Sequence, residues 1–162
     1  MAAVPKALEP DREAAGRMIL QMLDDVGLEV YAAAWVFSRD TQRWRYVVST
    51  PLLRLKGPGW IYERLLKVFV AKGLPAGVTP LDVFIIDPEM EMGVLGASLM
   101  GIENNAPGLD MPLMAITDAD FGPFAVPYGF IAIYRRIMQE KRRAPDVMRF
   151  ADRARKLSAQ HA

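Results

Sequence analysis

The sequence predicts a single α+β domain: a mixed or mainly antiparallel sheet of about five strands, helices packed on it, and a basic C-terminal helix. Three observations lead to this class. The length of 162 residues matches one domain, which we expect to span 1–162. An apolar fraction of 52% and a charged fraction of 24% are ordinary for a globular protein. Segments with a period of two alternate along the chain with segments of helical period.

The N-terminal part predicts a helix over residues 10–26. Pro10 suits a first helical turn, and Gly27 suits a position just beyond a helix end. The acidic residues Asp11 and Glu13 favour the positive end of the helix dipole. Between these signals, alanine, methionine and leucine recur at nearly helical spacing, so one face of this helix is expected to be buried.

The next segment, VYAAAWVFSRDTQRWRYVVST, predicts a β-hairpin. It is rich in β-branched and aromatic residues on both sides of a polar loop. If Ser38 pairs with Arg43, two aromatic pairs lie together on one face of the sheet, where such pairs stabilise the hairpin. These expected pairs are Phe37 with Trp44 and Trp35 with Tyr46.

The rest of the chain predicts two helices and three strands around one further acidic segment. STPLLRLKGPGW breaks the sheet, and a helix follows from Trp60 to about Lys72. The apolar run PLDVFIIDP predicts a strand covered on both faces. LMAIT and VPYGFIAIYR predict two strands joined across DADFGPFA. Residues 144–162 predict a basic amphipathic helix with a frayed end.

The acidic stretch DPEMEMG has two interpretations. Asp87 suits a helix N-cap, Pro88 suits the first helical position, and Glu89 and Glu91 suit the first turn. We therefore expect a helix that begins after Asp87. In an extended segment the same carboxylates would share one face and attract a divalent cation, but the Asp/Asn/Gly loop of calcium sites is missing. The residues expected to be buried by the helix are Met90, Val94, Leu95, Leu99 and Ile102.

The composition excludes several kinds of catalytic site. There is no cysteine, which excludes disulfides, thiolate metal sites and cysteine nucleophiles. The one histidine, His161, is the penultimate residue, where chain ends fray. No phosphate-binding or dinucleotide-binding motif is present, and the GPG at 57–59 is more typical of a stiff turn than of an anion site. The residues favour a protein that is not an enzyme and has no cofactor or metal.

Two small groups of residues are candidate binding sites. Asp118 and Asp120, two residues apart where a strand passes into a loop, could act in acid–base or cation chemistry, although Asx turns explain them equally. Trp35 and Trp44, with Arg45 nearby, resemble the base-stacking face of single-stranded nucleic-acid binders. A buried aromatic core is the alternative interpretation of that face.

Positive charge is concentrated at the C-terminus. Residues 135–162 carry nine basic and three acidic residues, whereas residues 76–134 carry eight acidic residues and no basic one. The tail could contact phosphates or an acidic protein, form a solvated helix face, or pair with the acidic middle of the chain. The candidate nucleic-acid-binding residues are Arg142, Arg143, Arg149, Arg153, Arg155 and Lys156.

The stretch AAWVFSRDTQRWRYVVSTPLL…GPGWIYERL resembles a group of short uncharacterised bacterial proteins. The matching pieces are Trp44-Arg45, Thr50-Pro51-Leu52, Gly57-Pro58 and Tyr134-Arg135. This resemblance implies an α+β fold and a bacterial source, and it brings no activity with it.

Together these observations predict a non-catalytic interaction or accessory protein of the bacterial cytoplasm, whose partner is a protein, either a second copy or another chain. The longest uncharged stretch has 14 residues, too few to cross a membrane, and the N-terminus lacks a signal sequence. One alternative is a nucleic-acid-binding protein that uses the basic C-terminal helix. Another is a small hydrolase or cation-binding protein that uses Asp118 and Asp120.

Overall fold

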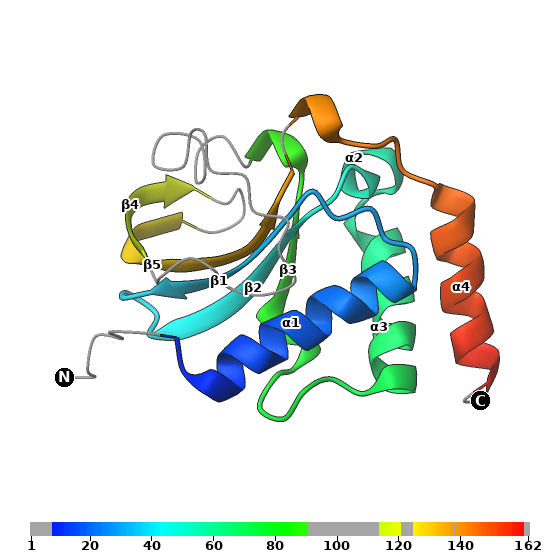
Figure 1. The fold of residues 1–162 in the computed structure, drawn as a ribbon, viewed down its shortest axis with the longest axis horizontal. Coiled ribbons are helices and arrows are strands. Elements are labelled where there is room, and N and C mark those ends of the chain that lie inside the picture. The colour runs from blue at the N-terminus through cyan, green and yellow to red at the C-terminus, as the bar shows by residue number, and fades with distance from the viewer. Residues whose placement is uncertain (1–7, 91–113, 121–124, 138, 161–162) are drawn as a thin grey trace.

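The computed structural model describes residues 8–90, 114–120, 125–137 and 139–160 (Figure 1). It shows the predicted α+β domain, with a five-stranded mixed sheet in the order β3-β2-β1-β5-β4. The strands are β1 (Ala32–Ser38), β2 (Arg43–Ser49), β3 (Val83–Ile86), β4 (Met114–Asp120) and β5 (Ala125–Arg136). The α-helices are α1 (Pro10–Asp25), α2 (Leu52–Lys56), α3 (Pro58–Lys72) and α4 (Val147–Gln160). Short 3-10 turns are η1 (Pro80–Asp82), η2 (Pro88–Met90) and η4 (Gln139–Lys141).

The sheet is antiparallel except at one edge. β1 pairs with β2 and β5, and β5 pairs with β4, all antiparallel, whereas β2 and β3 are parallel. A parallel pair needs a crossover connection, and α2 and α3 supply it. The hairpin register matches the prediction at Ser38 with Arg43, and the aromatic pairs follow from it.

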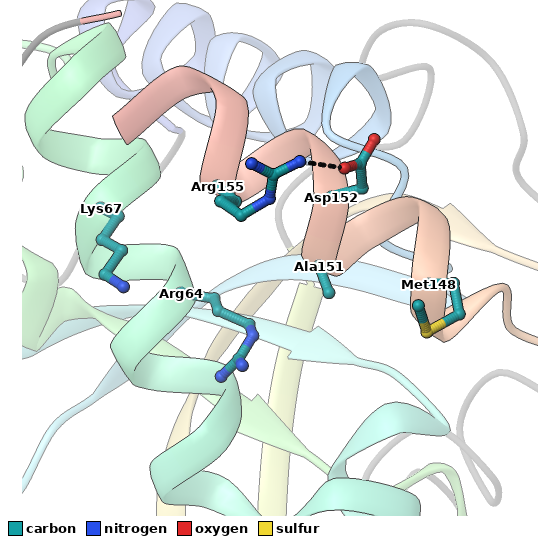
Figure 2. Close-up of a pocket in the computed structure, with 6 residues that line it drawn as sticks. All are labelled: Arg64, Lys67, Met148, Ala151, Asp152 and Arg155. Carbon is teal, nitrogen blue, oxygen red and sulfur yellow. Dashed lines mark hydrogen bonds and ion pairs between the residues drawn. The ribbon is translucent and has the colours of Figure 1, made fainter. Parts of the chain in front are cut away.

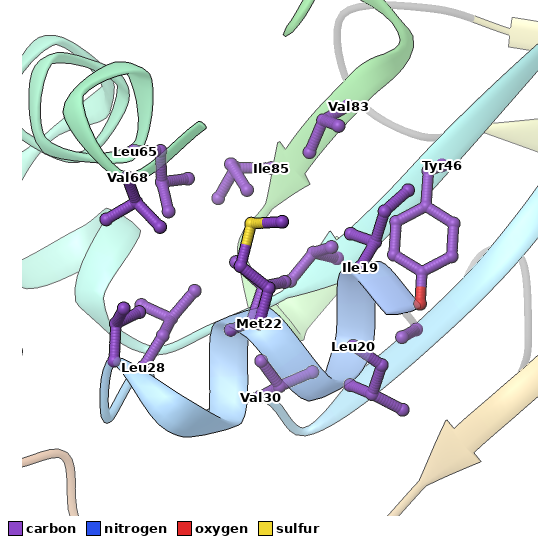
Figure 3. Close-up of a cluster of buried hydrophobic side chains, with 14 of the residues drawn as sticks. Ile19, Leu20, Met22, Leu28, Val30, Tyr46, Leu65, Val68, Val83 and Ile85 are labelled. Carbon is purple, nitrogen blue, oxygen red and sulfur yellow. The ribbon is translucent and has the colours of Figure 1, made fainter. Parts of the chain in front are cut away.

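Helix α1 covers the aromatic face of the sheet. Trp35 and Tyr46 are completely buried beneath it, in a core that also takes side chains from α3 (Figure 3). The Trp35 and Tyr46 rings meet edge to face with centroids 5.0 Å apart, the arrangement that aromatic quadrupoles favour. The predicted aromatic face is therefore the main core of the domain.

Three aromatic side chains from three strands attach to the backbone of α1. A buried hydroxyl or indole N–H needs an acceptor, and a helix carbonyl keeps a second lone pair after its own helical hydrogen bond. Each of the three groups uses such a carbonyl in the first half of α1. The hydrogen bonds run from Trp35 Nε1 to the Arg12 carbonyl (2.9 Å), from Tyr46 Oη to the Gly16 carbonyl (2.8 Å) and from Tyr134 Oη to the Glu13 carbonyl (2.7 Å).

The opposite face of the central strands is also buried. Ala34 and Val36 of β1 cluster there with Ile131 and Ile133 of β5. β3 contributes to both clusters, with Ile85 on the α1 side and Ile86 on the other. This confirms the prediction that the run VFII is covered on both faces.

Three local predictions need correction. The segment LLRLK forms a short helix, α2, which the sequence-based prediction missed. The strand predicted over PLDVFIIDP is shorter, because Thr79 and Asp82 form a capping box around η1. Asp118 and Asp120 lie in β4 rather than in a loop, because the ladder with β5 continues to the pair Asp120–Ala125. Cross-strand pairing there outweighs the weak strand preference of aspartate.

The predicted terminal helix begins at Val147, three residues later than expected. Asp146 ends the preceding segment, and its Oδ1 accepts the backbone N–H of Arg149 at 3.0 Å, which is the contact of an N-cap. His161 lies outside the described residues, as does most of the helix predicted after Asp87. None of the helices in the described ranges is long and apolar enough to cross a bilayer.

The close packing of α1 on Tyr134 predicts that a methyl group added at Gly16 destabilises the protein. A Cβ added at Gly16 would lie 2.4 Å from the Tyr134 ring. Gly16→Ala should therefore lower the free energy of unfolding by about 1–3 kcal/mol, although alanine favours a helix. The matched control is Gly59→Ala in α3, where no atom lies within 4 Å of the new methyl group, and stability should hold or rise. Urea unfolding of both variants measures this difference, and equal midpoints would contradict it.

The buried tyrosines predict loss of stability in alkali. Burial raises the pKa of Tyr46 and of Tyr134 above the ordinary value. From about pH 10 upward the unfolded chain loses these protons while the folded chain keeps them, so the free energy of unfolding falls as pH rises. Each tyrosine steepens the fall by up to about 1.4 kcal/mol per pH unit. Urea midpoints between about pH 8 and 11.5 should fall less steeply for Tyr46→Phe than for wild type. An equal fall of the midpoint with pH in both proteins would contradict a raised pKa of Tyr46 in the folded state.

Candidate functional site

Helix α4 packs beside α3 through the apolar stripe predicted for it. Phe150 and Ala154 are completely buried, and the Phe150 ring lies 5.8 Å from the ring of Trp60 in α3. The two helices run side by side in the same direction (Figure 1). Because only one stripe of each helix faces the core, their polar faces meet along a line that is open to solvent.

A groove of about 270 Å³ lies along this line (Figure 2). Its charged groups are three cations and one carboxylate, and the remaining side chains are apolar. The volume is below the roughly 300–1,000 Å³ typical of small-molecule sites. The groove is lined by Arg64 and Lys67 from α3 and by Met148, Ala151, Asp152 and Arg155 from α4.

Arg64 is held in place by Trp60, one turn earlier in α3. Its guanidinium carbon lies 3.9 Å from the centre of the Trp60 ring, and its Nη1 donates to the Trp60 carbonyl at 3.1 Å. The side chain is 27% exposed, against 47% for Lys67 and 71% for Arg155. Arg64 is thus a pre-positioned cation in the wall, because stacking and the hydrogen bond restrict its rotamers.

Asp152 pairs with two neighbouring cations of α4. It accepts hydrogen bonds from Arg155 at 2.7 Å and Lys156 at 3.0 Å, and these bonds lower the pKa of its carboxyl group. The carboxylate is therefore ionised and offsets part of the positive charge. Exposed ion pairs of this kind are weak, so an incoming anion can compete with Asp152 for Arg155.

A second basic groove, of about 200 Å³, has a structural explanation. It lies where α1, α3 and α4 each end, and the C-terminal ends of helices carry partial negative charge. Arg153 donates to the Asp25 carbonyl at 2.9 Å, and Lys72 is the last residue of α3. These cations complement helix ends. Arg64, Lys67 and Arg155 lie away from the ends of their helices, so this explanation does not apply to them.

The other predicted basic residues are spread over the fold. Arg142 stacks on Tyr31 at 4.7 Å and donates to the Ile137 carbonyl at 2.8 Å. The Arg143 carbonyl accepts the Tyr31 hydroxyl at 2.6 Å. Arg149 lies against Gly27, where an added Cβ would be 2.9 Å from its Nε. The structure therefore brings only part of the predicted cluster to one surface.

The two tryptophan candidates lie on the α1 face of the sheet, and Arg45 lies on the other face. Trp35 is fully buried, whereas Trp44 is partly buried and lies 6.4 Å from Trp35. The guanidinium of Arg12 covers both rings, at 5.0 and 5.2 Å. Arg45 lies on the opposite face, 5.9 Å from the Phe84 ring. Trp35 therefore presents no surface on which a base could stack.

The acidic candidates include one confirmed cap. Asp87 Oδ1 accepts the Glu89 N–H at 2.9 Å at the start of η2, and Arg54 pairs with both carboxylates. The hydrogen bond from Arg54 lowers the pKa of Glu89. In the parts of the chain that the structure describes, no group of three acidic or histidine side chains could hold a metal ion. For Asp118 and Asp120 the structure describes only the backbone, so cation binding there stays a prediction.

Comparison with known proteins finds no matching family model, no similar curated protein and no similar solved structure. The resemblance to short bacterial proteins therefore stays a prediction. The functional argument rests on the residues of this chain alone.

Sequence-based reasoning missed the α3 half of the groove. Arg64 and Lys67 are spaced three residues apart on the polar side of a predicted helix, which is a weak signal because solvated helix faces look the same. Their partners, Met148 and Arg155, lie more than 80 residues later in the sequence. Only the pairing of α3 with α4 shows that these residues share one surface.

The two grooves predict different responses to loss of charge. Arg153→Gln removes a cation and a donor at the end of α1, and should lower the free energy of unfolding by about 0.3–1 kcal/mol at low salt. Lys67→Gln removes a cation from the middle of α3 and should change stability by less than about 0.5 kcal/mol. Thermal unfolding at low and high salt separates the two. A larger loss for Lys67→Gln would assign the groove cations a structural role.

Proposed function

We propose that this chain is a non-catalytic accessory protein of the bacterial cytoplasm, which binds an acidic protein partner in the α3–α4 groove. The observation that carries the proposal is the excess of three cations over one carboxylate in a groove away from the helix ends. Helix ends do not account for this charge. Glu63 of α3, which does not line the groove, lies 3.9 Å from Arg64 and 3.6 Å from Lys67 and offsets part of it. These exposed pairs are weak, and surfaces of one sign attract partners of the other.

Exposed apolar side chains favour a protein over a nucleic acid. Met148 in the groove is 77% exposed, and Val70, one turn after Lys67 on α3, is 83% exposed. Interfaces between proteins combine an apolar centre with a polar rim and favour methionine and arginine. A phosphate backbone would use the cations and leave the apolar groups in water.

Nucleic-acid binding is the second candidate function. Arg155 and Lys156 are exposed next to each other on α4, and phosphate contacts need little beyond such cations. Arg142 and Arg149, however, pack against Tyr31 and Gly27, and neither lines the groove. The candidate therefore depends on fewer residues than the sequence suggested.

Binding of labelled poly-L-glutamate, followed by fluorescence anisotropy at low salt, tests the proposed function. Lys67→Glu/Arg155→Glu should weaken binding by about tenfold or more. The control Arg17→Glu/Arg43→Glu changes the net charge equally but lies outside the groove, and should bind as wild type does.

A duplex DNA and a single-stranded RNA oligonucleotide serve as competing probes. We expect both to bind more weakly than polyglutamate when compared at equal charge. Tighter binding of either oligonucleotide, lost in the groove variant, would replace the proposal with the nucleic-acid alternative. Equal loss in both double variants would show that binding follows net charge, and would refute the proposed site.

A further inference from the structure

Starting from the proposed function, we infer that the occupant of the α3–α4 groove is an amphipathic acidic helix of the partner. It lies along the groove with an apolar stripe on Met148 and Ala151, and with carboxylates facing the cations on both walls. The inference adds a shape and a residue pattern to the acidic partner proposed above.

The walls of the groove suit a third helix. Helices pack by placing side-chain ridges of one into grooves of another, with axes about 8–10 Å apart. Ala151 is small and lets a backbone approach, whereas Met148 is flexible and adapts its shape to what it contacts. Both lie on the groove side of α4, as Figure 2 shows. An extended strand would find no sheet edge here with which to pair.

The spacing of the cations matches the repeat of a helix. Arg64 and Lys67 are three residues apart on α3, which corresponds to about 4.5 Å along the axis. Acidic residues three or four apart on a partner helix have nearly the same separation. Arg155 lies across the groove on α4, so a carboxylate on the other side of the apolar stripe would reach it. The expected pattern is acidic residues on both flanks of an apolar stripe.

The length of the groove sets the length of the occupant. From Met148 to Arg155 the α4 axis advances about 10 Å, or two turns. A helix of about 12–15 residues is about 18–22 Å long, so it covers this distance with one to two turns to spare. A helix that short is marginal in water. The partner segment therefore gains helical structure on binding.

The test uses two labelled 14-residue peptides of the same composition, built from glutamate, leucine and alanine. In the patterned peptide the leucines form one helical stripe flanked by glutamates, and in the scrambled isomer they are distributed around the helix. Fluorescence anisotropy measures affinity, and circular dichroism measures helix formation. The patterned peptide should bind about tenfold more tightly than the isomer and become helical on binding.

Two variants test whether the peptide binds in the α3–α4 groove. Met148→Ser should lower the affinity for the patterned peptide by about tenfold and leave the affinity for the isomer nearly unchanged, because only the leucine stripe contacts the methionine. Asp152→Asn should raise the affinity for both peptides, because it removes the carboxylate that offsets part of the positive charge of the groove. Failure of Met148→Ser to distinguish the peptides would refute a helix seated in the groove.

The outcomes separate this inference from the proposed function. Equal affinity of the two peptides, lost in Lys67→Glu/Arg155→Glu, would overturn the helical occupant and keep the acidic partner. Absence of binding for both peptides and for polyglutamate would overturn both proposals. Binding of the patterned peptide without helix formation would also refute the inferred occupant.

Discussion

The attachment of α1 to the aromatic face of the sheet is the constraint on which the other features depend. Three side chains from three different strands place their polar atoms on the carbonyls of Arg12, Glu13 and Gly16 in the first half of one helix, while their rings fill the core. Burial of these rings supplies the hydrophobic contribution, and the hydrogen bonds fix where along the helix they lie. Gly16 makes the close approach possible, since any side chain there would meet Tyr134.

The position of α1 in turn places the C-terminal helix. Asp24, near the end of α1, forms a two-point ion pair with Arg135 of β5, with distances of 2.7 and 2.8 Å. The next residue offers its carbonyl to Arg153 of α4. Gly27, with φ at 77°, turns the chain and leaves room for Arg149. The groove between α3 and α4 therefore depends on contacts at the C-terminal end of α1, although α1 does not line it.

Local patterns made the fold predictable, and long-range pairing made the site hard to predict. The hairpin register follows from neighbouring residues, because one-residue slips would move Trp35 and Tyr46 to the wrong face. The start of α1 is also a local property, because Pro10 suits the first helical position. α2 was missed because Pro51 resembles a sheet breaker. Arg64 was missed because Arg155, which lines the same groove, lies in a helix 91 residues later in the sequence. The meaning of a basic residue here depends on whether a helix end lies beside it, and that is a property of the assembled fold.

The central claim is that the surface formed by α3 and α4, and not the aromatic hairpin, is where a partner binds. The three indole N–H resonances in a nitrogen–proton correlation spectrum test it most directly, during titration with an acidic amphipathic peptide. Trp60 stacks on a groove cation, whereas Trp35 and Trp44 lie beneath Arg12. The account predicts that the Trp60 signal shifts and that the Trp35 signal stays in place. A shift of the Trp35 and Trp44 signals with Trp60 unchanged would contradict it.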